Sequence, residues 1–139
     1  MIKSFIELKE RLQQQGQTGR IAAVCVKDEA TREALRLAEE AGIAKAIYVD
    51  DDEPTEAAAR AVVMIRRGEA DVLMKGLIGT DQLLRAILNK ETGILRRTEQ
   101  AGAVLTHLTL TEIPAYHKML LFTDAAVIPY PTQEQRIVR

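Results

Sequence analysis

The sequence predicts an α/β fold of three layers, in which a mostly parallel sheet lies between two layers of helices. Up to residue 90, short apolar runs alternate with segments of helical periodicity, which is the pattern of strands joined by crossover helices. The apolar runs are continuous, as in RIAAVCV at 20–26, and this is typical of strands covered on both faces. The chain has 139 residues, 47% of them hydrophobic and 28% charged, which is enough for one core. We therefore expect residues 1–139 to form a single α/β domain.

Helical spacing and capping residues define the first elements. A helix is predicted to end at Gly16, because an apolar stripe precedes it. The stripe consists of Ile2, Phe5, Ile6, Leu8 and Leu12. After the strand at 20–26, Asp28 can cap a second helix, which Gly42 closes. A second buried strand follows at 45–49.

The third repeat of helix and strand has equally clear boundaries. Pro54 begins an alanine-rich helix that ends at Gly68. A strand is predicted at 71–74 and a helix at 80–89.

The pattern changes after residue 90. A polar stretch leads to an apolar run at 103–110, and a polar turn separates it from a second run at 119–123. Two strands joined by a polar turn predict an antiparallel hairpin or sheet edge within 103–123.

Composition excludes several functional classes. A net charge of −1 and only 4% aromatic residues, with no tryptophan, give no support for a nucleic-acid partner. No apolar run approaches the ~18 residues of a membrane span, and the charged N-terminus is not a signal peptide. The single cysteine, Cys25, excludes an intrachain disulfide and a multi-cysteine metal site. We expect a cytoplasmic protein with no metal and no membrane partner.

The strongest candidate site follows the strand at 71–74. Lys75 and Gly76 end this strand, and Thr80 offers a hydroxyl at the N-cap of the next helix. A lysine ammonium, glycine-exposed amides and a helix N-terminus together suit an anion such as phosphate. Arg85, further along this helix, faces either the same cleft or solvent. An ordinary strand–turn–helix connection remains the alternative, because the segment matches neither a Walker loop nor a dinucleotide fingerprint.

Two further positions carry candidate groups. Thr123 ends the last predicted strand, and Asp124 after it is an acid–base group, an orienter of a phosphate site or a helix cap. His107 lies in the predicted strand at 103–110, where a lone histidine is a structural or a catalytic residue.

Together these segments resemble the phosphate acyltransferases, in particular phosphate butyryltransferase, with phosphate acetyltransferase as a more distant relative. The matching stretches are SFIELKE, IAAVCVKDE, ALRLAEEAGIAKAIYVD, EAAARAVVMIRRGEADVLMKGLIGTDQLLRAILNKETGI, LTHLTLTEIPAYHKMLLFTDAAV and PTQEQ. The resemblance implies the first domain of the family's fold, which is like that of isocitrate and isopropylmalate dehydrogenases.

The resemblance also implies an activity, namely reversible transfer of an acyl group between coenzyme A and inorganic phosphate. Coenzyme A is then a substrate, and no covalently bound cofactor is needed. By motif, Lys75, Gly76 and Thr80 would line the cleft, and Arg85 would bind an anionic part of coenzyme A or of the acyl phosphate. Thr123 and Asp124 would face the same cleft, whereas the resemblance gives His107 no role.

The sequence departs from the family pattern in two ways. Family members are about twice as long and have a second domain, which we expect to be absent after residue 139. The chain also looks shortened between Val49 and Glu53, where relatives carry a further strand and helix. Catalysis by this chain alone would require a homo-oligomer that builds the cleft from two subunits. The alternatives are a non-catalytic module that binds coenzyme A or phosphate, and a structural paralogue that binds nothing.

Overall fold

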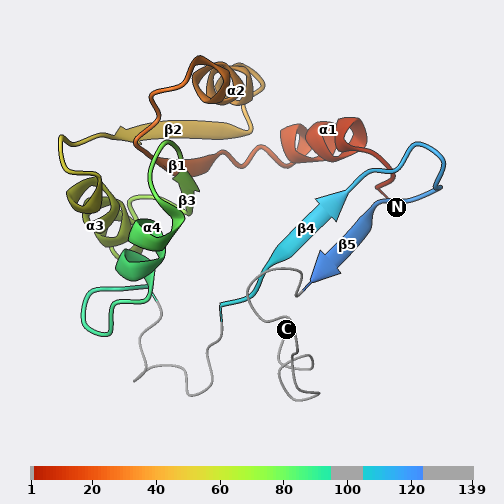
Figure 1. Ribbon diagram of the computed structural model, residues 1–139. Helices are drawn as coiled ribbons and strands as arrows, with labels where there is room; N and C mark the ends of the chain where they lie inside the picture. Colours follow the sequence, from red (N-terminus) through yellow and green to blue (C-terminus); the bar gives the residue numbers. More distant parts are fainter. Residues whose placement is uncertain (1, 95–104, 124–139) are drawn as a thin grey trace. The chain divides into compact units, whose positions relative to one another are not determined.

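The computed structural model describes residues 2–94 and 105–123. These residues belong to two compact units (Figure 1), one of residues 12–94 and one of residues 2–11 with 105–123. In the described part of the chain, no helix combines the length and the apolar character that crossing a membrane requires.

The unit of residues 12–94 is built on a three-stranded parallel sheet. Strand β1 (Gly19–Val24) lies in the middle, between β2 (Ala44–Val49) and β3 (Val72–Lys75). Helix α2 (Glu29–Glu40) connects β1 to β2, and α3 (Pro54–Arg66) connects β2 to β3. The alternation of strands and helices thus gives the parallel sheet that the sequence predicts.

Two buried clusters lie on opposite faces of this sheet, because the side chains of β1 alternate between them. On one face, Ala22 and Val24 pack with α3 and with Leu83 of α4 (Thr80–Ile87). On the other face, Ala23 packs with Leu35 of α2. The α3 face is rich in alanines without exposed surface, namely Ala57, Ala58 and Ala61. The helices therefore form two layers around the sheet, which confirms the predicted three-layer fold (Figure 1).

The predicted helix boundaries agree with capping interactions in the structure. The Asp28 carboxylate accepts a hydrogen bond of 2.8 Å from the Thr31 amide at the start of α2. Hydrogen bonds from Thr31 lower the pKa of Asp28 below its usual value, because they stabilise the charged carboxylate. Pro54 occupies the first turn of α3. Gly42 and Gly68, just after α2 and α3, have φ values of 71° and 68°, which only glycine adopts easily.

One predicted strand is too long. The apolar run at 20–26 continues to Val26, but β1 ends at Val24. Cys25 has a φ of 53° and turns the chain out of the strand, although Cys25 and Val26 stay buried. Burial therefore continues beyond the end of β1, so the hydrophobicity of the sequence alone does not show where this strand ends.

The second unit contains an antiparallel hairpin of β4 (Leu108–Thr111) and β5 (Leu120–Thr123). Its register pairs Leu108 with Thr123 and Thr111 with Leu120. The amide of Phe5, the first residue of α1 (Phe5–Gln15), donates a hydrogen bond of 2.7 Å to the Glu112 carboxylate. The hairpin is confirmed, with strands shorter than predicted; residues 103 and 104 lie outside the described residues.

An ion pair links the start of β1 to the start of β3. The Arg20 guanidinium donates to both carboxylate oxygens of Asp71, at 2.7 and 3.0 Å, and to the carbonyl oxygen of Gly68 at 2.7 Å. The amide of Asp71 donates in turn to the Arg20 carbonyl at 2.8 Å. Hydrogen bonds from Arg20 lower the pKa of Asp71 to about 2. The pair thus joins the start of β3 to β1, the central strand of the sheet.

This low pKa predicts a change of stability in acid. A carboxyl whose pKa is lower in the folded state stabilises the fold above its unfolded pKa of about 3.9, and this contribution is lost as the pH falls towards 2. We expect Asp71→Asn to remove this component, and Arg20→Gln to do the same because it removes the partner. The measurement is the urea midpoint of unfolding between pH 2 and pH 5. Curves of both variants that ran parallel to the wild-type curve would contradict the prediction.

Candidate anion-binding site

Three strand ends meet at one edge of the parallel sheet. Val24, the last residue of β1, lies opposite Val49 of β2 and Lys75 of β3. The loops that follow therefore start side by side, and this edge is where open α/β sheets bind ligands.

The loop after β3 is held firmly against the end of β1. The amides of Gly76 and Leu77 donate hydrogen bonds of 2.8 Å to the carbonyl oxygens of Val24 and Cys25. The Cys25 amide donates to the Val49 carbonyl at 3.1 Å. These bonds explain why Cys25 keeps a left-handed conformation that costs a non-glycine residue about 1–2 kcal/mol.

Gly76 is required by this close approach. A Cβ atom at position 76 would lie 2.5 Å from the carbonyl oxygens of both Val24 and Cys25. Two residues later, Ile78 is only 5% exposed and joins the core. The loop is thus fixed by backbone bonds at its start and by a buried side chain near its end.

The N-cap of helix α4 is Gly79, one residue before the predicted cap, Thr80. Gly79 is the N-cap, and its amide donates a hydrogen bond of 3.2 Å to the Gln82 side chain. Thr80 is the first helical residue, so the expectation that its hydroxyl is the cap is wrong. Gly79 is not helical, with φ −58° and ψ 133°, and Gln82 accepts from its amide as the N3 side chain of a capping box does. The exposed Thr80 therefore lies at the positive end of the helix dipole.

Lys75 is exposed at the end of β3, and its ammonium donates a hydrogen bond of 3.4 Å to the Gly76 carbonyl. It forms no ion pair with any described residue, and its charge is available to a ligand. Lys75, Gly76 and Thr80 therefore belong to one short segment, as predicted.

The strand order adds a reason why this segment is a binding position. Strand β1 leads to α2 on one face, whereas β3 leads to α4, which packs with α3 on the other face. Adjacent strands whose loops leave to opposite faces form a topological switch point, where α/β folds bind ligands. The loops after β1 and β3 meet this condition.

Arg85 lies in a different hollow, between α3 and α4. This hollow has a volume of about 380 Å³, and the Arg85 side chain there is 84% exposed, 4.0 Å from the Asp81 carboxylate. Its lining residues include Thr55, Ala59 and Val62 of α3. Lys75, Gly76 and Thr80 are not among the described residues that line this hollow. The structure thus does not bring Arg85 into one pocket with the loop.

The remaining candidates belong to the other unit. Thr123 is exposed at the end of β5, opposite Leu108, and Asp124 lies outside the described residues. His107 comes directly before β4, so its predicted place within a strand is wrong. Its Nδ1 is buried without a hydrogen-bond partner among the described residues, and its Nε2 is 3.5 Å from the Thr109 hydroxyl.

Sequence reasoning missed a second hollow at the same sheet edge, lined by residues after β1 and β2. Its lining residues are Lys27, Arg32, Asp50, Asp51 and Asp52. The run of three aspartates directly after a buried strand was the available signal. Within the described residues, no three His, Cys, Asp or Glu side chains form a possible metal-binding group.

The fold defines an α/β protein with a candidate anion site at the strand ends, and comparisons with known proteins identify the family. The family described as phosphate acetyl/butaryl transferase matches residues 9–138. Phosphate butyryltransferases of Clostridium beijerinckii and Clostridium acetobutylicum are 31% and 32% identical over 99% of this chain and 51% of their own length. A branched-chain phosphotransacylase from Enterococcus faecalis superposes with a TM-score of 0.67 at 22% identity, covering 87% of this chain and 47% of its own.

This chain belongs to the phosphate acetyl- and butyryltransferase family. It spans about half the length of the curated relatives it matches.

Proposed function

We propose that this chain takes part in reversible acyl transfer between coenzyme A and inorganic phosphate, as a phosphate acyltransferase of the butyryl type. Family membership supports the reaction class. The observation that carries the proposal is the segment from Lys75 to Thr80. It joins an ammonium that has no ion-pair partner among the described residues, a glycine loop and a helix N-terminus at a topological switch point.

The reaction needs little beyond positioning and charge stabilisation. An oxygen of phosphate attacks the thioester carbonyl, a C–O bond forms, the C–S bond breaks, and the coenzyme A thiolate leaves and takes up a proton. Lys75 and the first amides of α4 would hold the phosphate, since they offer positive charge without a bulky side chain at Gly76. Arg85 would bind an anionic part of coenzyme A or of the acyl phosphate. Coenzyme A is thus a substrate, with no covalently bound cofactor.

Several finer points belong to the same proposal. Thr123 and Asp124 would contribute from the end of β5, with Asp124 as the candidate catalytic group. A single α/β domain, a homo-oligomer, a cytoplasmic location and the absence of nucleic-acid and membrane partners also stay predictions.

Arg85→Ala tests the proposal directly. The wild-type chain, mixed with butyryl-CoA and phosphate, should release free thiol in a phosphate-dependent manner, followed with a thiol reagent. We expect Arg85→Ala to lower this rate about 10²-fold, because it removes the positive charge that would bind an anionic part of coenzyme A or of the acyl phosphate. Arg67→Ala is the matched control, since Arg67 is 70% exposed and only 3.8 Å from the Glu69 carboxylate; it should keep the rate.

Two outcomes would change the conclusion. A folded sample that binds coenzyme A but releases no thiol would make the chain a non-catalytic binding relative of the family. Equal rates for Arg85→Ala and Arg67→Ala would remove Arg85 from the site.

A further inference from the structure

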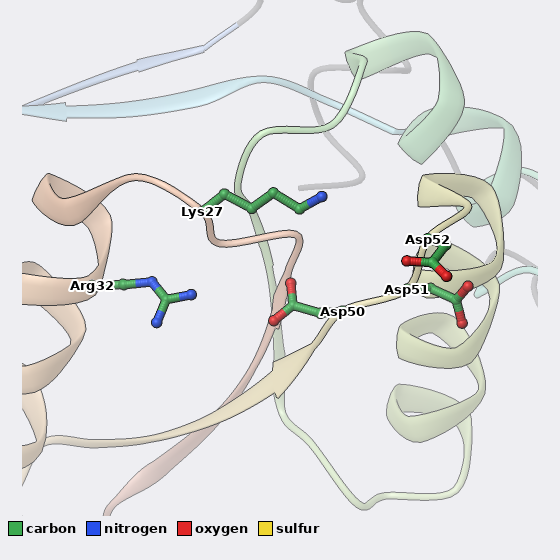
Figure 2. Close-up of a pocket in the computed structure, with 5 residues that line it drawn as sticks. All are labelled: Lys27, Arg32, Asp50, Asp51 and Asp52. Carbon is green, nitrogen blue, oxygen red and sulfur yellow. The ribbon is translucent and has the colours of Figure 1, made fainter.

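The second hollow at the sheet edge collects charges of both signs. It has a volume of about 520 Å³, and Figure 2 shows its five lining side chains. Lys27 extends from the loop after β1, and Arg32 comes from the first turn of α2. The three aspartates at 50–52 come from the segment between β2 and α3.

Most of these charges form no ion pair with another described residue. Arg60 neutralises Asp51 at 3.0 Å and donates a second hydrogen bond, of 2.7 Å, to the backbone carbonyl of Asp50. Among the described residues, the side chains of Lys27, Asp50 and Asp52 form no ion pair or hydrogen bond.

Arg32 lies near an aromatic ring and forms no salt bridge within the described part of the chain. Its guanidinium lies 6.0 Å from the centre of the Tyr48 ring, within range of a cation–π contact. Its N–H groups form no hydrogen bond with a described residue. The hollow therefore offers two cations, Lys27 and Arg32, and two free carboxylates to a ligand.

A ligand that satisfies both kinds of group needs an anion and hydroxyl donors close together. Carboxylates accept hydrogen bonds from hydroxyls, and lysine or arginine binds phosphate oxygens. A ribose that carries phosphate has this combination.

The position in the fold supports the same ligand. In dinucleotide-binding βαβ units, an acidic residue at the end of the second strand binds the ribose 2′-hydroxyl. Asp50 directly follows β2 and has that position relative to β1 and α2. The loop at 25–28 has the sequence CVKD, without glycine, so side chains rather than a tight glycine turn must hold the phosphate.

We propose that this hollow binds the ribose and phosphate of a nucleotide, with Asp50 accepting from the ribose 2′-hydroxyl and Lys27 and Arg32 contacting the phosphate. The nucleotide is the one that coenzyme A carries, and to this extent the inference rests on the proposed function. The Lys75 loop follows β3, which neighbours β1, so strand spacings of ~4.8 Å place this loop roughly 5 Å from the β1 end of the hollow and roughly 10 Å from its β2 end. A long coenzyme can therefore reach both positions.

The test is nucleotide binding by the full chain, which needs no turnover. Adenosine 3′,5′-bisphosphate, ADP and pantetheine are titrated by calorimetry and by amide chemical shifts. We expect the bisphosphate to shift the amides of residues 26–28 and 49–52, and Lys27→Ala and Asp50→Asn each to weaken its binding at least tenfold. Pantetheine binding should not change in these variants. Lys45→Ala, an exposed lysine at the opposite end of β2, is the matched control and should bind as the wild type does.

The outcomes separate this inference from the proposed function. Nucleotide binding that both variants weaken, in a chain that releases no thiol, would support the inference and contradict the proposed activity. Shifts confined to the hollow of Arg85, or affinities unchanged in both variants, would overturn the inference and leave the acyl transfer standing. Tighter binding of ADP than of the bisphosphate would overturn the assignment to coenzyme A in favour of a free nucleotide.

Discussion

Gly76→Ala is expected to destabilise the protein by about 3 kcal/mol and to displace the loop that carries Lys75. The added Cβ would lie 2.5 Å from two carbonyl oxygens, those of Val24 and Cys25, and neither can move without breaking the sheet edge. Overpacking against rigid atoms costs about 1–3 kcal/mol or more. For a chain of this size, this corresponds to a decrease in Tm of about 10 °C, measurable by thermal unfolding. The rate of the proposed acyl transfer should fall as well, because the hydrogen bonds of Gly76 and Leu77 would be lost.

Gly19→Ala provides the matched control. A Cβ at position 19 would meet only the Ile43 carbonyl at 3.8 Å, which is an ordinary contact. Its Tm should change by no more than about 2 °C, given the ±0.5 kcal/mol typical of substitutions away from special features. If the two alanine variants had equal stability, the close approach of the loop to β1 would be wrong.

Leu35→Ala is expected to lower the free energy of unfolding by about 2–5 kcal/mol, the usual range for a buried leucine. Leu35 is 3% exposed and packs with Ala23 and Val26 on the α2 face of the sheet. Its neighbours in this cluster are small or only partly buried, so they cannot refill the space that the shorter side chain leaves. The measurement is the free energy of unfolding from urea titration.

The same helix supplies the control for Leu35. Leu37, two residues later, is 51% exposed, and Leu37→Ala should change the free energy of unfolding by less than about 1 kcal/mol. A loss for Leu37→Ala as large as that for Leu35→Ala would show that α2 packs through another face.

The fold could be predicted because its determinants are local. Caps such as Asp28 and Pro54 and glycines such as Gly42 and Gly68 bound each helix through interactions within a few residues. The end of β1 could not be predicted in this way, because Cys25 leaves the strand while staying buried. Burial depends on the helices around the strand, whereas the end of the strand depends on the bonds of Cys25 to neighbouring loops.

The candidate site could be predicted only in part. The segment from Lys75 to Thr80 is continuous in sequence, so its residues necessarily lie together. The sequence places Arg85 close to them because it follows on the same helix, but the packing of α4 against α3 brings its side chain into a separate hollow. The hollow of Lys27 and Asp50 joins the ends of two strands, and only the register of β1 with β2 reveals that they are neighbours.

The bonds between the β3 loop and β1 also have a consequence for dynamics. Because the amides of Gly76 and Leu77 donate to the carbonyls of Val24 and Cys25, they should exchange with deuterium as slowly as the strand amides, although they belong to a loop. A loop that is already ordered loses little conformational entropy when an anion arrives. Recognition at this edge would then be of the lock-and-key kind, with an association rate set by diffusion and charge rather than by a slow closing motion.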